Sequence, residues 1–131
     1  MTYLIFILIY LFLGNEIETT DVHLSFGRRA GCIGSGACAI ETPESYHKST
    51  YDAIGTIEVI NNDLILKINK SSISVADAKA QFKQNIFTME EELPLSENLS
   101  RAIGVDQNRK ISIGNYTVIE SKNFHKITFT K

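Results

Sequence analysis

The stretch GTIEVINNDLILKIN, residues 55–69, decides the fold of this chain. Apolar and polar residues alternate before the Asn-Asn-Asp run in its middle. After that run, Leu64, Leu66 and Ile68 fall on one face of an extended chain. Asn and Asp tolerate the left-handed backbone of a tight turn. The stretch therefore predicts a β-hairpin that buries one face in the core.

Further short segments on both sides of this hairpin have the pattern of strands. Val22, Leu24 and Phe26 alternate with polar or small residues, which is the period of a half-buried strand. The other segments expected to be extended are 37–41, 86–89, 93–94, 116–120 and 124–130. The polar stretch from 42 to 52 is expected to be a surface loop. This pattern predicts a mainly β fold, a small, closed or partly open antiparallel barrel of OB-like type, with a sandwich-like α+β arrangement as the alternative.

Two short helices are expected among these strands. The first begins with Ser74 as its N-cap, places Phe82 on its apolar face and ends at about residue 84. The second has Ser96 as its N-cap. Its C-terminal end falls at Gly104, because glycine adopts the left-handed backbone that follows many helices.

The most constrained segment is FGRRAGCIGSGACAI, residues 26–40, which holds both cysteines and four of the eight glycines. Five residues separate Cys32 from Cys38, and glycines at 34 and 36 let the chain reverse tightly between them. Strand-like flanks would bring the two cysteines together across a hairpin, so we predict a disulfide. The short closed loop is expected to contact a protein partner. The residues assigned to this contact are Arg28, Arg29, Gly31, Cys32, Ile33, Gly34, Ser35, Gly36 and Cys38.

The cysteine pair also allows other interpretations. The main alternative is that the disulfide only stabilises the hairpin and the loop contacts no partner. The spacing C-x5-C lacks the tight pair of zinc ribbons, so no metal site is predicted. His125 shares a strand face with Ile127 and Phe129, which favours a core or rim position over a ligand role. No nucleophile–base or acid–base pair can be named, so we expect no enzyme activity and no cofactor.

The N-terminus predicts export. Residues 2–13 form an apolar run of about twelve residues, too short to span a bilayer but long enough for the core of a secretory signal. No Lys or Arg precedes the run, and a buried strand is the alternative. We expect 1–20 to be a signal peptide or apolar leader plus linker, and 21–131 to be one β-rich domain. The mature protein would lie in the periplasm, at the cell surface or outside the cell, with no stable membrane span.

The net charge and the composition indicate which classes of molecule are not expected as partners. The net charge is −2 and no basic patch is interleaved with aromatic residues, so nucleic acid is not an expected partner. Disulfides persist in oxidising compartments, which agrees with export.

Three motifs carry a resemblance to known proteins. The residues Phe26-Gly27-Arg28 and the C-x-G-x-G-x-C motif at 32–38, together with IGNYTV at 113–118, resemble a group of small exported bacterial proteins, most without an assigned function. The size, β content and N-terminal cysteine loop are also similar to potempin-type peptidase inhibitors, small β-barrel proteins that block secreted bacterial peptidases. Potempins are typically lipid-anchored, whereas no cysteine lies directly after the apolar run of this chain.

Two functions follow from these observations. The first is inhibition of a secreted peptidase by the loop from Arg28 to Cys38, entering the cleft in extended form. A metallopeptidase is one target class, because a loop carbonyl or thiolate could approach its metal. The second is an exported structural or binding module of the cell envelope that has no protease target.

Overall fold

The computed structural model of the protein describes residues 19–27, 36–44, 52–74 and 76–130. Nine strands lie in this part of the chain. They are β1 (Thr20–Phe26), β2 (Ala37–Glu41), β3 (Ala53–Ile60), β4 (Asp63–Asn69), β5 (Ile86–Met89), β6 (Leu93–Pro94), β7 (Lys110–Ile111), β8 (Gly114–Glu120) and β9 (Phe124–Phe129). The helices are the 3-10 helix η1 (Lys70–Ser72) and the α-helices α2 (Ala76–Lys83) and α3 (Glu97–Ile103).

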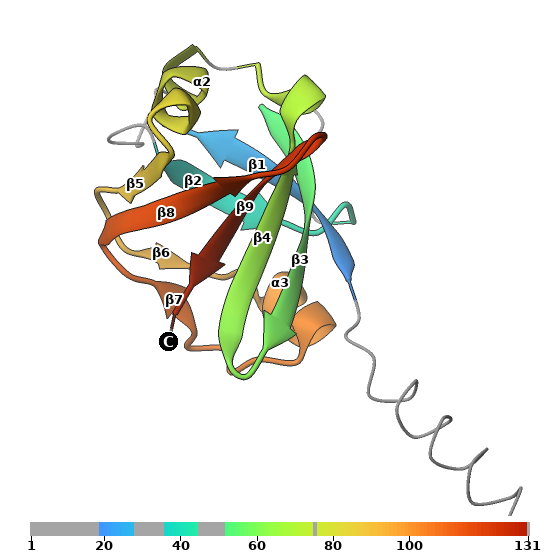
Figure 1. The fold of residues 1–131 in the computed structure, drawn as a ribbon. Helices are drawn as coiled ribbons and strands as arrows, with labels where there is room; N and C mark the ends of the chain where they lie inside the picture. Colours follow the sequence, from blue (N-terminus) through green and yellow to red (C-terminus); the bar gives the residue numbers. More distant parts are fainter. Residues whose placement is uncertain (1–18, 28–35, 45–51, 75, 131) are drawn as a thin grey trace, which may run out of the picture.

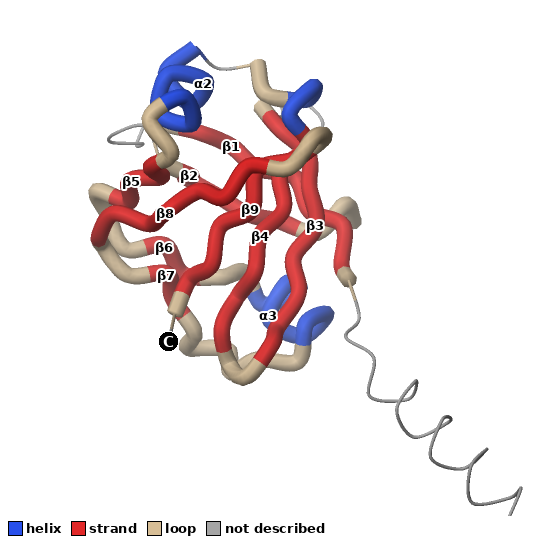
Figure 2. Tube along the Cα trace, viewed as in Figure 1, coloured by secondary structure: helices blue, strands red, loops and turns tan. Residues whose placement is uncertain are grey.

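Seven of these strands form one antiparallel sheet in the order β2-β1-β3-β4-β9-β8-β5. The sheet curves into a half barrel (Figure 1; Figure 2). The strands β6 and β7 form a separate two-stranded pair. The two α-helices lie at opposite ends of the sheet, where α2 contacts β5 and α3 contacts β2 and β3 (Figure 1). The prediction of a mainly β fold with an antiparallel, partly open barrel and two short helices is therefore confirmed.

The β3–β4 hairpin has the geometry that its sequence predicts. Its turn consists of Asn61 and Asn62, whose φ angles are 52° and 72°. Positive φ at both turn residues matches the twist of the flanking strands, and Asn tolerates it. Leu64, Leu66 and Ile68 each have 0% exposure, so the predicted core face is confirmed.

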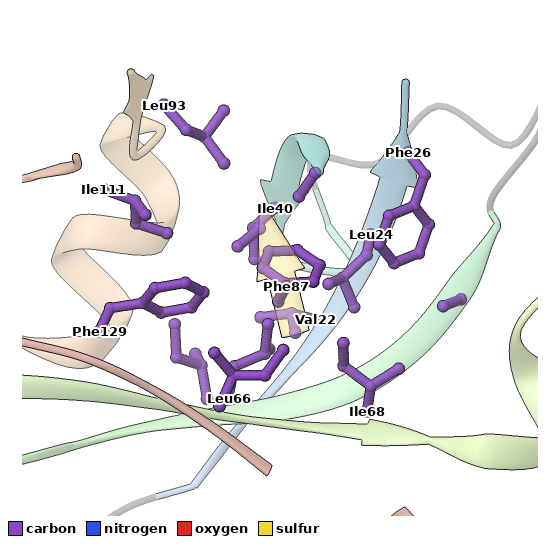
Figure 3. Close-up of a cluster of buried hydrophobic side chains, with 14 of the residues drawn as sticks. Val22, Leu24, Phe26, Ile40, Leu66, Ile68, Phe87, Leu93, Ile111 and Phe129 are labelled. Carbon is purple, nitrogen blue, oxygen red and sulfur yellow. The ribbon is translucent and has the colours of Figure 1, made fainter. Parts of the chain in front are cut away.

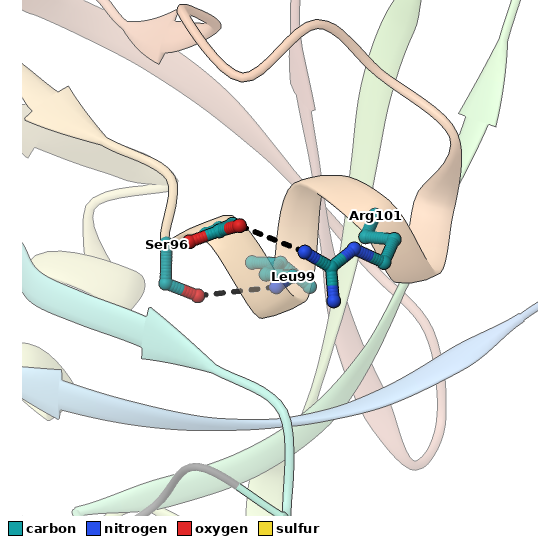
Figure 4. Close-up of polar contacts among 4 residues, drawn as sticks. Ser96, Leu99 and Arg101 are labelled. Carbon is teal, nitrogen blue, oxygen red and sulfur yellow. Dashed lines mark hydrogen bonds and ion pairs between the residues drawn. The ribbon is translucent and has the colours of Figure 1, made fainter.

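The helix α3 has a cap at each end, and Figure 4 shows the one at its N-terminus. The hydroxyl of Ser96 accepts a hydrogen bond of 3.1 Å from the Leu99 N–H, as a Ser N-cap does. Gly104 ends the helix with φ 74°. Between the caps, the Arg101 guanidinium lies 2.7 Å from the Glu97 carboxylate one turn away. Both predicted ends of this helix are confirmed.

The described part of α2 begins at Ala76. Residue 75 lies outside the described residues, so the assignment of Ser74 as the N-cap stays a prediction. The N–H and the hydroxyl of Ser74 both donate to the carbonyl oxygen of Asp52, at 2.9 and 3.1 Å. Ser74 therefore links the segment before α2 to Asp52, the residue directly before β3. The helix ends at Lys83, close to the expected position.

The core is one cluster of buried apolar side chains, and Figure 3 shows those from strands β1, β2, β4, β5, β6, β7 and β9 meeting in it. The helices contribute Ala78 and Phe82 from α2 and Leu99 from α3. Four phenylalanines, Phe26, Phe82, Phe87 and Phe129, are among the core's largest fully buried side chains. The Phe82 and Phe87 rings stack at 5.8 Å, and the Phe26 ring meets their edges at 6.3 and 6.1 Å. These three residues come from α2, β5 and β1. Ring pairs of this kind add roughly 0.5–1.5 kcal/mol each beyond their buried area.

The N-terminal prediction lies almost wholly outside the described residues, so the leader assigned to 1–20 stays a prediction. Within the described ranges, no helix is long and apolar enough to cross a membrane.

Candidate functional site

Only two of the predicted contact residues, Gly36 and Cys38, belong to the described part of the chain. Seven fall outside it: Arg28, Arg29, Gly31, Cys32, Ile33, Gly34 and Ser35. The structure does define the residues from which this segment leaves and to which it returns. We call Phe26, Gly27, Gly36 and Asp52 the loop base.

The two ends of the segment meet at the loop base. The Gly27 N–H donates to the Gly36 carbonyl oxygen at 3.1 Å. Both glycines are buried, and Phe26 beside them has 1% exposure. Residues 28–35 thus join two points that one hydrogen bond holds together. The predicted return of the chain as strand 37–41 is confirmed by the antiparallel pairing of β2 with β1.

Cys38 occupies an irregular position in this pairing. Ser25 faces Ala39, whereas the next residue, Phe26, faces Ala37, so Cys38 is the extra residue of a β-bulge. A bulge twists the strand locally and re-aims the side chain at the extra position. Cys38 is half-buried and does not carry a free thiol. Its pairing with Cys32 stays a prediction because Cys32 is not among the described residues. Nothing in the local sequence pattern indicated the bulge.

Asp52 fixes the loop base from a second direction. Its carboxylate accepts a hydrogen bond of 3.0 Å from the Phe26 N–H, just past the end of the β1–β3 ladder. Its own N–H donates to the Leu24 carbonyl at 3.1 Å, and its carbonyl accepts the two bonds from Ser74. Sequence reasoning placed Asp52 at the end of a surface loop and missed this role. The sequence feature that could have indicated this role is the position of Asp52 directly before the strand that begins at Ala53.

Gly36 fixes the loop base from a third direction. A Cβ at this position would lie 2.1 Å from the Thr88 carbonyl oxygen and 3.0 Å from the Met89 sulfur. The backbone of Gly36 therefore lies against β5, although β2 and β5 are opposite edges of the sheet. The Thr88 N–H donates to Gln81 Oε1 of α2 at 2.6 Å. An edge strand whose polar groups are covered in this way is protected from pairing with another chain.

The core directly behind the loop base contains a buried histidine. The Phe26 ring contacts Phe82, which stacks on His125 with 4.4 Å between ring centroids. His125 has 7% exposure, its Nδ1 atom makes no hydrogen bond, and the nearest carboxylate oxygen, on Glu120, is 3.7 Å away. Burial, followed by the charge of Lys70, lowers the pKa of His125 below 6.5, and Glu120 opposes the shift. His125 is thus a neutral core residue near pH 7.

Within the described residues, no group of three or more His, Cys, Asp or Glu side chains could hold a metal ion. At the loop base, hydrogen bonds and close packing hold both ends of one short segment in place.

Comparison with known protein families, curated proteins and solved structures finds no match to this chain. The resemblance to exported β-domain proteins and to potempins therefore stays a hypothesis.

Proposed function

We propose that this protein is a small exported binding protein that presents residues 28–38 to a protein partner, and most concretely that it inhibits a secreted peptidase. The observation that carries the proposal is the fixation of both ends of the segment. The Gly27–Gly36 hydrogen bond, the Asp52 carboxylate and the contact of Gly36 with β5 act on the same few residues.

Fixed ends favour binding because a preorganised segment loses less conformational entropy on contact. The predicted Cys32–Cys38 disulfide would restrict the segment further, by about 2.4 kcal/mol of unfolded-chain entropy for a loop of this length. An extended segment of this kind enters a peptidase cleft by pairing with the edge of its sheet. Arg28 and Arg29 would add positive charge at the entrance, and a peptidase with an acidic cleft is the expected target.

The proposal is tested with a panel of secreted serine, cysteine and metallopeptidases, each assayed for residual activity after incubation with the purified protein. At least one peptidase is expected to be inhibited. Arg29→Ala is expected to weaken that inhibition about tenfold, which corresponds to roughly 1.4 kcal/mol. The matched control is Lys122→Ala, which removes an exposed cation from the β8–β9 turn and is expected to leave inhibition unchanged.

Two results would overturn this proposal. The first is that the folded protein inhibits no peptidase in the panel. The alternative, a structural or binding module of the cell envelope, would then be the better explanation. The second is equal loss of inhibition in Arg29→Ala and Lys122→Ala, which would mean that general charge, and not the loop, decides binding.

A further inference from the structure

A hollow lies on the outer face of the sheet, away from the core. Its volume is about 390 Å³, within the range of roughly 300–1,000 Å³ that is usual for small-molecule sites. It is lined by strands β1, β3, β4 and β9 and by Pro43, which follows β2. The side chains that matter for its chemistry are Asp21, Ile54, Thr56, Lys67 and Phe124.

The strand register places opposite charges two strands apart in one row, which continues from Lys67 to Lys126 on β9. Asp21 pairs with Thr56 across β1 and β3, and Thr56 pairs with Lys67 across β3 and β4. Neighbouring strands are about 4.8 Å apart, so the Cα atoms of Asp21 and Lys67 are separated by roughly 10 Å. A carboxylate, a hydroxyl and an ammonium group therefore follow one another across the hollow.

Both charged groups are accessible to a ligand. Asp21 is exposed and forms no ion pair with any other described residue. The Lys67 ammonium lies 3.9 Å from a Glu58 carboxylate oxygen and 5.3 Å from the centre of the Phe124 ring, and its side chain is 39% exposed. An ion pair this long and this exposed contributes little, about 0–1 kcal/mol. The ammonium can therefore donate to a ligand without a large loss.

The next row of the same face mixes polar residues, His23 and Asn69, with apolar ones, Ile54 and Phe124. Ile54 faces His23 on β1, and Phe124 faces Asn69 on β4. Ile54 and Phe124 are both half-buried, so each shows part of its side chain to the hollow. Partly exposed apolar side chains beside two separated opposite charges suit a ligand that carries an apolar group and both signs of charge.

We propose that this hollow binds a free dipeptide with an apolar side chain. Its α-ammonium group pairs with Asp21, its α-carboxylate pairs with Lys67, and its side chain packs on Ile54 and Phe124. An extended dipeptide spans at most about 7 Å, which fits between side chains whose Cα atoms are roughly 10 Å apart. A free amino acid is too short to reach both charges. Peptide-bond hydrolysis is the class of reaction that supplies such a ligand, and the proposal does not depend on the function of the loop.

The test is a titration of the ¹⁵N-labelled protein with leucyl-leucine, followed by the amide signals of residues 21–23, 54–56 and 67–69. Binding with a Kd of about 1 mM is expected, and blocking either end of the dipeptide by acetylation or amidation should weaken it at least about tenfold. Asp21→Asn and Lys67→Met are expected to produce the same loss. Lys67→Arg should retain binding within about threefold, because it keeps the charge. The matched control is Lys122→Met.

The signals of the remaining core residues report whether each variant is folded. The proposal is overturned if about 20 mM leucyl-leucine, far above the expected Kd, shifts none of these signals. It is also overturned if the doubly blocked dipeptide or free leucine binds as tightly as leucyl-leucine. Equal weakening by Lys122→Met would likewise exclude a specific site.

Discussion

Replacing Gly36 with alanine should destabilise the fold by forcing apart the two edges of the sheet. The new Cβ would lie 2.1 Å from the Thr88 carbonyl oxygen, whereas real Cβ contacts essentially never fall below 3.0 Å. The strand β5 or the start of β2 must therefore retreat by roughly 1 Å, an overpacking strain that typically costs about 1–3 kcal/mol. The blocking atom belongs to the backbone, so no side-chain rotation can relieve the collision.

The assay is urea unfolding of the parent and the variant, with amide signals of residues 86–89 as a local reporter. The midpoint is expected to fall and the signals of β5 to shift. Gly104→Ala is the contrast, because nothing lies within 4 Å of its Cβ and its cost comes only from φ 74°. That variant should be less stable by about 1 kcal/mol without moving the β5 signals. If Gly36→Ala unfolds within about 0.3 kcal/mol of the parent, the contact between β2 and β5 does not constrain the fold.

Three further predictions concern the surroundings of the loop. Asp52→Ala leaves the buried Phe26 N–H without an acceptor and should cost about 1–3 kcal/mol, which thermal unfolding measures, whereas Asp52→Asn should cost less. Burial lowers the pKa of His125 below 6.5, so the folded state favours the neutral imidazole. The contribution of this preference to the free energy of unfolding is fully present above pH 6.5 and is lost as the pH falls through the lowered pKa. His125→Phe should therefore reduce the loss of unfolding free energy between pH 7.5 and 5.5, and an unchanged pH dependence would contradict this. Replacing both Cys32 and Cys38 with Ser should cost at most about 2–3 kcal/mol, and thiol counting on the unfolded, unreduced parent should find no free thiol.

The features that could be predicted from the sequence are those set by neighbouring residues. The Asn61-Asn62 turn follows from the tolerance of Asn for positive φ, and the strands beside it follow from a period of two. The caps of α3 follow from Ser96 and Gly104, since each cap involves only residues within one or two turns. Local chemistry decides these elements before any long-range contact forms.

The features that could not be predicted depend on contacts between distant segments. Asp52 binds the N–H of Phe26, 26 positions earlier in the chain. The bulge at Cys38 appears only when the β1–β2 register is known. The hollow likewise requires the registers of three strands, which place Asp21 opposite Thr56 and Thr56 opposite Lys67. Periodicity assigns a residue to a face of a strand, but the neighbour across the sheet is decided by tertiary structure.

Gly36 shows why this difference matters for function. In the sequence, Gly34 and Gly36 appear equivalent, because both are able to supply the backbone freedom of a tight turn. In the structure, the described glycines with positive φ are Gly104 and Gly114, so Gly36 is required for another reason, the close approach of β5. A residue that the fold already requires is a poor reporter of binding. Substitutions at Gly36 should therefore lower stability and inhibition together, whereas Gly34→Ala should separate the two. Weaker inhibition at unchanged stability in Gly34→Ala would place the partner contact within residues 28–35.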